Sequence, residues 1–205
     1  MRVRPRGFGV RFLQVALPLG LWIGLAVCGM YVLRRSAAAP APRGQVPVHW
    51  PDDTGLSRTP GRPVMVVFAH PACACTCAAL SVLTEVAAEL GRAVDVQVVI
   101  DDDVPDPAVS EIAVRAHQIR GATVVIDRDH TETARFGPIT SGHTVLYSAG
   151  GDRLFVGGLT DGGGHPGPTA GRAHVVALVH GQKAASATPV FGCDLGAFPE
   201  RQRPP

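Results

Sequence analysis

The chain has 205 residues, of which 46% are hydrophobic and 5% are aromatic, and it contains five cysteines. This length suits one ordinary domain with an appendage, and the composition excludes a collagen-like repeat, a heptad array and a wholly disordered chain. Residues 1–44 hold seven arginines and no acidic residue, so the rest has 12 basic and 17 acidic groups, a net charge of −5. We therefore expect no nucleic-acid partner, because the positive charge surrounds a hydrophobic segment and does not cover the domain.

The N-terminal segment predicts a membrane anchor. Residues 12–33 are apolar apart from Gln14, and at about 1.5 Å per residue they just span a bilayer core of about 30 Å. More arginines precede this run than follow it, so the positive-inside rule places residues 1–11 in the cytoplasm and the domain outside. We therefore expect a single-pass protein of a bacterial inner membrane with a periplasmic domain.

A cleaved signal peptide is the alternative interpretation of this segment. Ala37-Ala38-Ala39 offers a small-residue cleavage pattern, with cleavage after Ala39. The apolar run is longer than a typical signal sequence, and Arg34 and Arg35 follow it directly, which favours the uncleaved anchor. Residues 34–49 are rich in alanine and proline and predict an extended linker.

A folded domain is expected over residues 50–183, with a polar C-terminal tail over 184–205. Continuous apolar runs and helical spacings predict an alternation of strands and helices. Asp106-Pro107 provides a helix start, with Asp106 as the cap, and Asp101-Asp102-Asp103 is interpreted as a solvated loop. The expected elements are strands at 63–69, 94–100 and 122–126, helices at 80–90, 106–119, 131–136 and 168–179, and a hairpin of 143–147 with 153–156. This order predicts an α/β fold with a mixed sheet flanked by helices.

Three of the five cysteines lie between the first predicted strand and the first predicted helix. They are Cys73, Cys75 and Cys77. The unpaired N–H groups and the dipole at a helix N-terminus stabilise a thiolate, so a cysteine there is both a nucleophile and a soft metal ligand. The nearby His70 either holds the turn or lowers the pKa of Cys73.

The element order and the stretch Phe68–Cys73 resemble the active-site strand and turn of the thioredoxin superfamily. The stretch 125–137 is similar to an insertion of its membrane-anchored extracytoplasmic members. The motifs at 70–77, 140–143 and 188–193 resemble those of RedB-type proteins. This resemblance implies a thioredoxin-like domain with redox-active cysteines, preceded by one transmembrane helix.

Two positions depart from the thioredoxin pattern. Thr76 stands where the resemblance would place a second active-site cysteine, and His143 stands where it would place a cis-proline facing the cluster. Cys73-x-x-x-Cys77 together with His143 is similar to the Sco-type copper chaperones, which implies Cu(I) bound by two thiolates and an imidazole. Any disulfide of Cys73 must use Cys75, Cys77 or Cys193.

The leading hypothesis is a thiol–disulfide oxidoreductase that needs no cofactor. Cys73 attacks, Cys75 or Cys77 resolves the mixed disulfide, and Cys193 is a further partner. The expected partners are extracytoplasmic thiol proteins or metalloproteins under maturation, with membrane attachment through residues 12–33. A copper chaperone using Cys73, Cys77 and His143 is the second hypothesis, and a degenerate thioredoxin-like binding module is the third.

Overall fold

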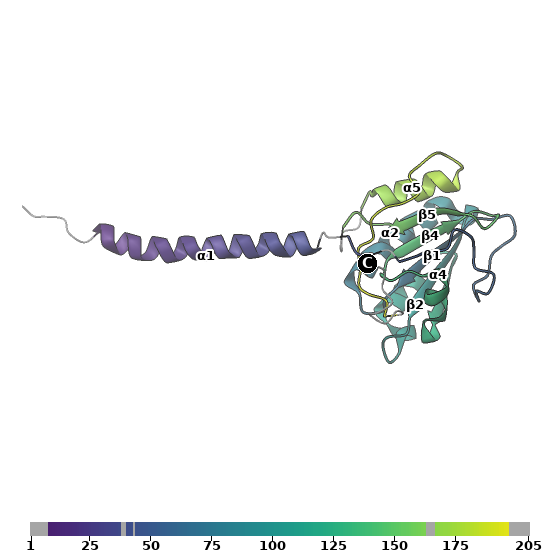
Figure 1. The fold of residues 1–205 in the computed structure, drawn as a ribbon, viewed down its shortest axis with the longest axis horizontal. Coiled ribbons are helices and arrows are strands. Elements are labelled where there is room, and N and C mark those ends of the chain that lie inside the picture. The colour runs from purple at the N-terminus through teal and green to yellow at the C-terminus, as the bar shows by residue number, and fades with distance from the viewer. Residues whose placement is uncertain (1–7, 38–39, 43, 163–166, 197–205) are drawn as a thin grey trace, which may run out of the picture. The chain divides into compact units, whose positions relative to one another are not determined.

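The computed structural model describes residues 8–37, 40–42, 44–162 and 167–196, and within the first helix it describes the side chains of residues 16–32. The chain divides into two compact units, residues 1–39 and 40–205 (Figure 1). Most of the expected cytoplasmic segment 1–11 and the flanking arginine side chains lie outside the described part.

The described part of the first unit is one long helix, α1 (Phe8–Ala37), which contains the whole predicted anchor. Its described side chains are all exposed within the chain, including Leu17 at 65% and Trp22 at 68%. Among the described residues, Ala74–Ala93 is the one helical stretch both long and apolar enough to cross a membrane, but half of that window is buried inside the second unit. The apolar part of α1, Ala16–Val32, is shorter.

The second unit is built on a five-stranded mixed sheet. Its strands are β1 (Val64–Ala69), β2 (Asp95–Asp101), β3 (Ala122–Asp127), β4 (His143–Tyr147) and β5 (Arg153–Gly158). They lie in the order β3-β2-β1-β4-β5. The first three are parallel, β4 is antiparallel to β1, and β5 is antiparallel to β4. The predicted strands and hairpin are thus confirmed, and β1 is buried on both faces, as its continuous apolar run indicated.

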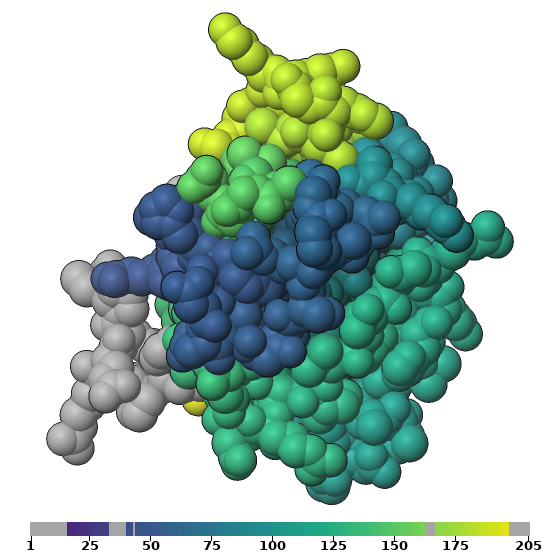
Figure 2. All heavy atoms as spheres, turned by 90° about the vertical axis from the view of Figure 1, so that its right-hand side faces the viewer, coloured from purple at the N-terminus to yellow at the C-terminus, as the bar shows by residue number. Residues whose placement is uncertain are grey.

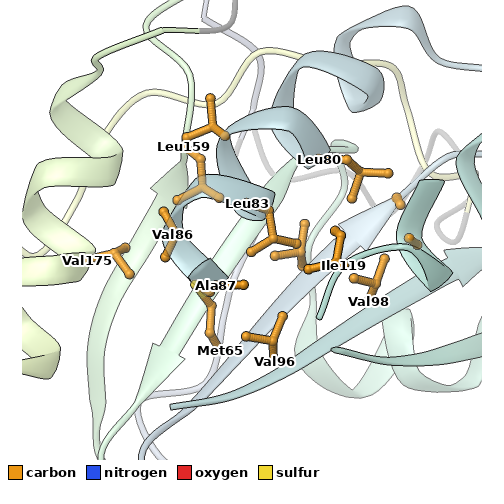
Figure 3. Packing of buried hydrophobic residues seen from close by; sticks show 14 of the residues in the cluster. Met65, Leu80, Leu83, Val86, Ala87, Val96, Val98, Ile119, Leu159 and Val175 are labelled. Atoms are coloured by element: carbon orange, nitrogen blue, oxygen red, sulfur yellow. The ribbon is translucent and has the colours of Figure 1, made fainter. Parts of the chain in front are cut away.

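Helices cover both faces of this sheet. They are α2 (Ala74–Leu90), α3 (Glu111–His117), α4 (Thr131–Phe136) and α5 (Ala170–Val179), with 3-10 turns at Gly91–Ala93, Pro107–Val109 and Arg128–His130. One core cluster joins α2, α3 and α5 to the sheet. Figure 3 shows Leu83 of α2, Val175 of α5 and Met65 of β1 among the side chains of this cluster. The predicted apolar stripe of α2 is buried in this layer, because its members recur at helical spacing.

The opposite face of the sheet carries an aromatic cluster. The ring of Phe136 from α4 lies 5.2 Å from that of Trp50 and 5.6 Å from that of Phe68, and the ring of Tyr147 lies 5.4 Å from that of Trp50. Val46 is buried in the same cluster, so part of the segment 34–49 that we expected to be linker packs in the domain. Figure 2 shows the chain before β1, drawn in blue, at the molecular surface.

The start of the second domain helix differs from the prediction. Pro107 begins a 3-10 turn, and α3 begins only at Glu111 with Ser110 as its cap. The Ser110 hydroxyl accepts a hydrogen bond from the Ala113 N–H at 3.1 Å, whereas Asp106 makes no side-chain cap bond. Val109, which we expected on the apolar stripe, is 69% exposed because it lies in the turn. Serine satisfies the free N–H groups of a helix start at least as well as aspartate does.

The described part of the tail, residues 184–196, packs on the domain. Gly158 N–H donates to the Pro189 carbonyl at 3.0 Å, and Val190 and Leu195 are buried. A Cβ on Gly157 would lie 2.4 Å from the Thr188 carbonyl oxygen, so this close approach requires glycine. The tail is polar in composition, as the sequence analysis noted, but its few apolar residues are buried against the domain.

Candidate active site

The turn between β1 and α2 is held by His70. The Ala72 N–H donates to His70 Nδ1 at 3.1 Å, and the Cys73 N–H donates to the His70 carbonyl at 3.2 Å. His70 Nε2 lies 3.7 Å from a carboxylate oxygen of Asp103. Of the two roles that the sequence left open for this histidine, the geometry favours support of the turn.

Cys73 is the N-terminal cap of α2 and is 2% exposed. The Ser141 hydroxyl, from the segment before β4, donates to the Cys73 sulfur at 3.2 Å. The Cys193 thiol, from the tail, also donates to this sulfur. Three separated parts of the chain thus meet at one sulfur atom, at the carboxyl end of β1.

These contacts favour the thiolate form of Cys73. Burial alone would raise its pKa, but the hydrogen bonds from the Cys193 thiol and the Ser141 hydroxyl, with smaller contributions from backbone N–H groups, lower the pKa to about 7. About half of Cys73 is therefore ionised at pH 7, and the ionised fraction rises with pH. A buried, hydrogen-bonded thiolate at a helix N-terminus is chemically a nucleophile.

The backbone of Cys193 forms a hydrogen bond with Ser141, the residue whose hydroxyl donates to Cys73. Its N–H donates to Ser141 Oγ at 2.9 Å, so this hydroxyl links Cys193 to Cys73. Burial, followed by the hydrogen bond and charge of Cys73, raises the pKa of Cys193 to about 12. When Cys73 is ionised, the remaining proton of the pair therefore stays on Cys193.

The other two cluster cysteines lie in the first turn of α2. Cys75 is half-buried, and burial together with the neighbouring Cys73 raises its pKa. Cys77 is partly buried against the core. Thr76 is fully buried, and its hydroxyl has no hydrogen-bond partner among the described residues. All five cysteines are free thiols in this structure.

His143 is the first residue of β4 and is completely buried. The donor atoms of Cys73, Cys77 and His143, all within the described part of the chain, do not all lie within 4.8 Å of one another. The structure brings the Ser141 hydroxyl into contact with the Cys73 sulfur, and copper binding by the predicted triad stays a prediction. No peptide bond of the described residues is cis.

Sequence reasoning did not assign a role to Ser141. It lies inside the motif 140–143, but only the pairing of this motif with the tail shows that its hydroxyl reaches Cys73.

Asp101 is a second residue whose environment the sequence did not predict, because we interpreted 101–103 as a solvated loop. Asp101 is 1% exposed, its Oδ1 lies 2.8 Å from His130 Nδ1, and burial raises its pKa to about 7.

Comparisons with known proteins identify the fold but not a family. No family model and no curated protein matches the chain. A hypothetical protein from Sinorhizobium meliloti is similar in structure, with a TM-score of 0.57 and 17% identity over 79% of this chain and 96% of its own. An uncharacterized protein from Geobacillus kaustophilus is also similar, with a TM-score of 0.57 and 15% identity. The match covers 80% of this chain and 94% of that protein. A secreted Mycobacterium tuberculosis disulfide oxidoreductase matches with 19% identity and a TM-score of 0.40. This match covers 60% of this chain and 83% of that protein.

The parallel β1–α2–β2 unit is joined to an antiparallel hairpin, and a cysteine caps the helix that follows β1. The fold is thioredoxin-like. Cys73 caps the helix that follows β1, which is the position that the sequence predicted for it. The thioredoxin-like fold predicted from the sequence is confirmed by the strand order and the strand directions.

We expect Ser141→Ala to raise the pKa of Cys73 above about 7, because the thiolate loses a hydrogen-bond donor. A one-unit rise would slow alkylation of Cys73 by iodoacetamide at pH 7 roughly fivefold, with no change above pH 10. The check is the pH profile of the alkylation rate, measured by mass spectrometry of the Cys73 peptide. Ser148→Ala, in the distant hairpin turn, is the matched control, and an unchanged profile in Ser141→Ala would contradict the assignment.

Proposed function

We propose that this protein is a membrane-anchored, extracytoplasmic thiol–disulfide exchange protein in which Cys73 is the attacking thiolate. One observation carries the proposal: a buried sulfur with a pKa of about 7 caps α2 and accepts hydrogen bonds from Ser141 and Cys193. No cofactor is needed for this chemistry, since the exchanged electrons come from thiols. The clients would be disulfide-bearing or dithiol proteins outside the cytoplasm, including metalloproteins under maturation.

The chemistry of α1 supports the anchor. Its described side chains are apolar and exposed around the whole helix, which is unfavourable in water and favourable in a bilayer. At about 1.5 Å per residue, this helix of 30 residues is roughly 45 Å long, more than a bilayer core. We propose that residues 12–33 cross the inner membrane once, with residues 1–11 in the cytoplasm.

The exchange balances as two thiolate displacements. The Cys73 thiolate attacks one sulfur of a client disulfide, which forms a mixed disulfide and releases the other client sulfur as a thiolate. A second cysteine of this chain then attacks Cys73, and the remaining client sulfur leaves. The client gains two electrons and two protons, and the chain gains one internal disulfide, which a dithiol donor reduces again.

We assign the second attack to Cys193. Its thiol already donates a hydrogen bond to the Cys73 sulfur, and it comes from a segment far from Cys73 in the sequence, so no small ring restrains a disulfide between them. Cys75 is separated from Cys73 by one residue, and such a small ring is strained. The pKa of Cys193 falls when Cys73 enters a mixed disulfide, because the thiolate that raises it is gone.

Trapping of the mixed disulfide tests this assignment. Reduced full-length protein in detergent is mixed with glutathione disulfide, quenched with acid and analysed by mass spectrometry. We expect Cys193→Ser to accumulate glutathione on Cys73 about tenfold above the wild type, since the resolving thiol is missing. Cys75→Ser and Cys77→Ser are the matched controls and should resolve normally. If Cys75→Ser or Cys77→Ser accumulates the adduct and Cys193→Ser does not, the assignment is wrong.

The same preparation discriminates the copper hypothesis. Reduced protein is titrated with Cu(I) against a competing chelator, in the wild type and in His143→Ala. Stoichiometric tight binding that His143→Ala weakens would replace our proposal with a copper chaperone. Thiols that neither exchange nor bind Cu(I) would instead leave a binding module without redox chemistry.

A further inference from the structure

A short piece of the tail lies extended against the chain that leads into β4. Residues 193–195, which we call the docked segment, pair with residues 139–141. Two backbone hydrogen bonds join them, from the Ser141 N–H to the Cys193 carbonyl at 2.8 Å and from the Leu195 N–H to the Ile139 carbonyl at 3.1 Å, and together they form an antiparallel bridge between Thr140 and Asp194. Main-chain pairing of this kind holds a peptide whatever its side chains are.

Side chains two residues apart give the docked segment its fit. In an extended chain, residues 193 and 195 point to the same side. The Cys193 thiol meets Cys73, while Leu195 is 1% exposed and packs in the core cluster that contains Phe68 and Phe136. Asp194, between them, is exposed. The site therefore accepts a cysteine followed, two positions later, by a large apolar residue.

The residue before the cysteine is also constrained. A Cβ on Gly192 would lie 2.0 Å from the Ser141 carbonyl oxygen and 2.7 Å from its hydroxyl. Real side chains do not approach backbone so closely, so glycine is required at this position. The local sequence that fits beside Cys73 is Gly-Cys-x-Leu.

We propose that the docked segment occupies the client-binding site of this protein, and that a client enters by replacing it. The client is a polypeptide whose cysteine lies in an extended Gly-Cys-x-apolar stretch, paired through its backbone with residues 139–141. This inference rests on the proposed function, because it makes Cys73 the atom that the client disulfide meets. The tail is then both a competitor of the client and the carrier of the resolving thiol.

This arrangement couples client release to the return of the tail. The client displaces the docked segment, its disulfide sulfur is attacked by Cys73, and its other sulfur leaves as a thiolate. When the docked segment pairs again with residues 139–141, Cys193 attacks Cys73 and the client leaves as a thiolate. The two events need the same backbone groups, so the client strand and the docked segment exclude each other.

Two peptides of equal composition test the inference. One is Phe-Gly-Cys-Asp-Leu-Gly, the sequence of residues 191–196, and the other is Phe-Gly-Cys-Leu-Asp-Gly, in which the apolar residue is misplaced. Each carries its cysteine as a mixed disulfide with thionitrobenzoate, whose coloured release reports the attack. Rates are measured with reduced full-length protein in detergent, and the rate of Cys73→Ser is subtracted. We expect the first peptide to react about tenfold faster, since it buries its leucine.

Loosening the tail should increase this rate. Leu195→Ala removes the apolar contact of the docked segment, so the first peptide should react severalfold faster than with the wild type. Leu90→Ala removes a comparably buried leucine from the other face of the sheet and is the matched control, with no expected change in peptide rate.

The outcomes separate this inference from the proposed function. Discrimination between the peptides together with acceleration by Leu195→Ala supports it. Equal peptide rates, while glutathione disulfide still modifies Cys73, overturn the docking inference alone. A Cys73 that reacts with neither peptides nor glutathione disulfide overturns both.

Discussion

Cys73→Ser should abolish thiol–disulfide exchange. A serine hydroxyl is not ionised at pH 7, so the attacking thiolate is lost and the rate of client reduction should fall by about a thousandfold or more, as when other enzymes lose a nucleophile. The rest of the site remains in place, because oxygen can still accept the hydrogen bond from Ser141. The rate of reduction of a peptide disulfide by the full-length protein is the measurement.

Cys28→Ser is the matched control for this experiment. Cys28 lies in α1, outside the thioredoxin-like domain, and its replacement should leave the exchange rate unchanged. Comparable activity in Cys73→Ser and the wild type would mean that another cysteine attacks, and the assignment of the nucleophile would be wrong.

Phe136→Ala should have the largest effect on stability. The Phe136 ring is fully buried and contacts the rings of Trp50, Phe68 and Tyr147. Removing it leaves a cavity beneath α4, and we expect the free energy of unfolding to fall by about 3–5 kcal/mol. Urea denaturation in detergent, followed by tryptophan fluorescence, measures this loss, since Trp50 borders the cavity.

The matched control for Phe136→Ala is Val109→Ala. Val109 is 69% exposed in the turn before α3, and its truncation should change stability by less than about 0.5 kcal/mol. Equal unfolding midpoints for the two variants would show that the aromatic cluster does not hold this face of the domain together.

Much of the fold could be predicted from local patterns. The run Val64–Ala69 is apolar at every position and is a central strand, and the spacing of Leu80, Leu83 and Leu90 marked the buried face of α2. The position of Ser110 as a cap was missed, because Asp106-Pro107 is an equally good helix start in sequence terms. When two candidate caps lie four residues apart, the packing of the helix that follows determines which of them begins it.

The site could be predicted only where its residues are close in sequence. Cys73 followed from its place between a strand and a helix, but its partner Ser141 is 68 residues away and reaches it through the sheet. Asp101 was interpreted as solvated since three acidic residues in a row are usually exposed, yet a histidine from another loop pairs with it. Contacts between distant loops leave no periodic signal in the chain.

The path of the tail along β5 also affects solubility. Val156 of β5 donates to the Ser186 carbonyl at 2.9 Å and accepts from the Thr188 N–H at 3.3 Å, so the tail covers the outer backbone of a terminal strand. An uncovered edge strand offers free N–H and carbonyl groups to other chains and promotes aggregation. A protein shortened before Ser186 would therefore lose its protection against edge-to-edge self-association as well as Cys193.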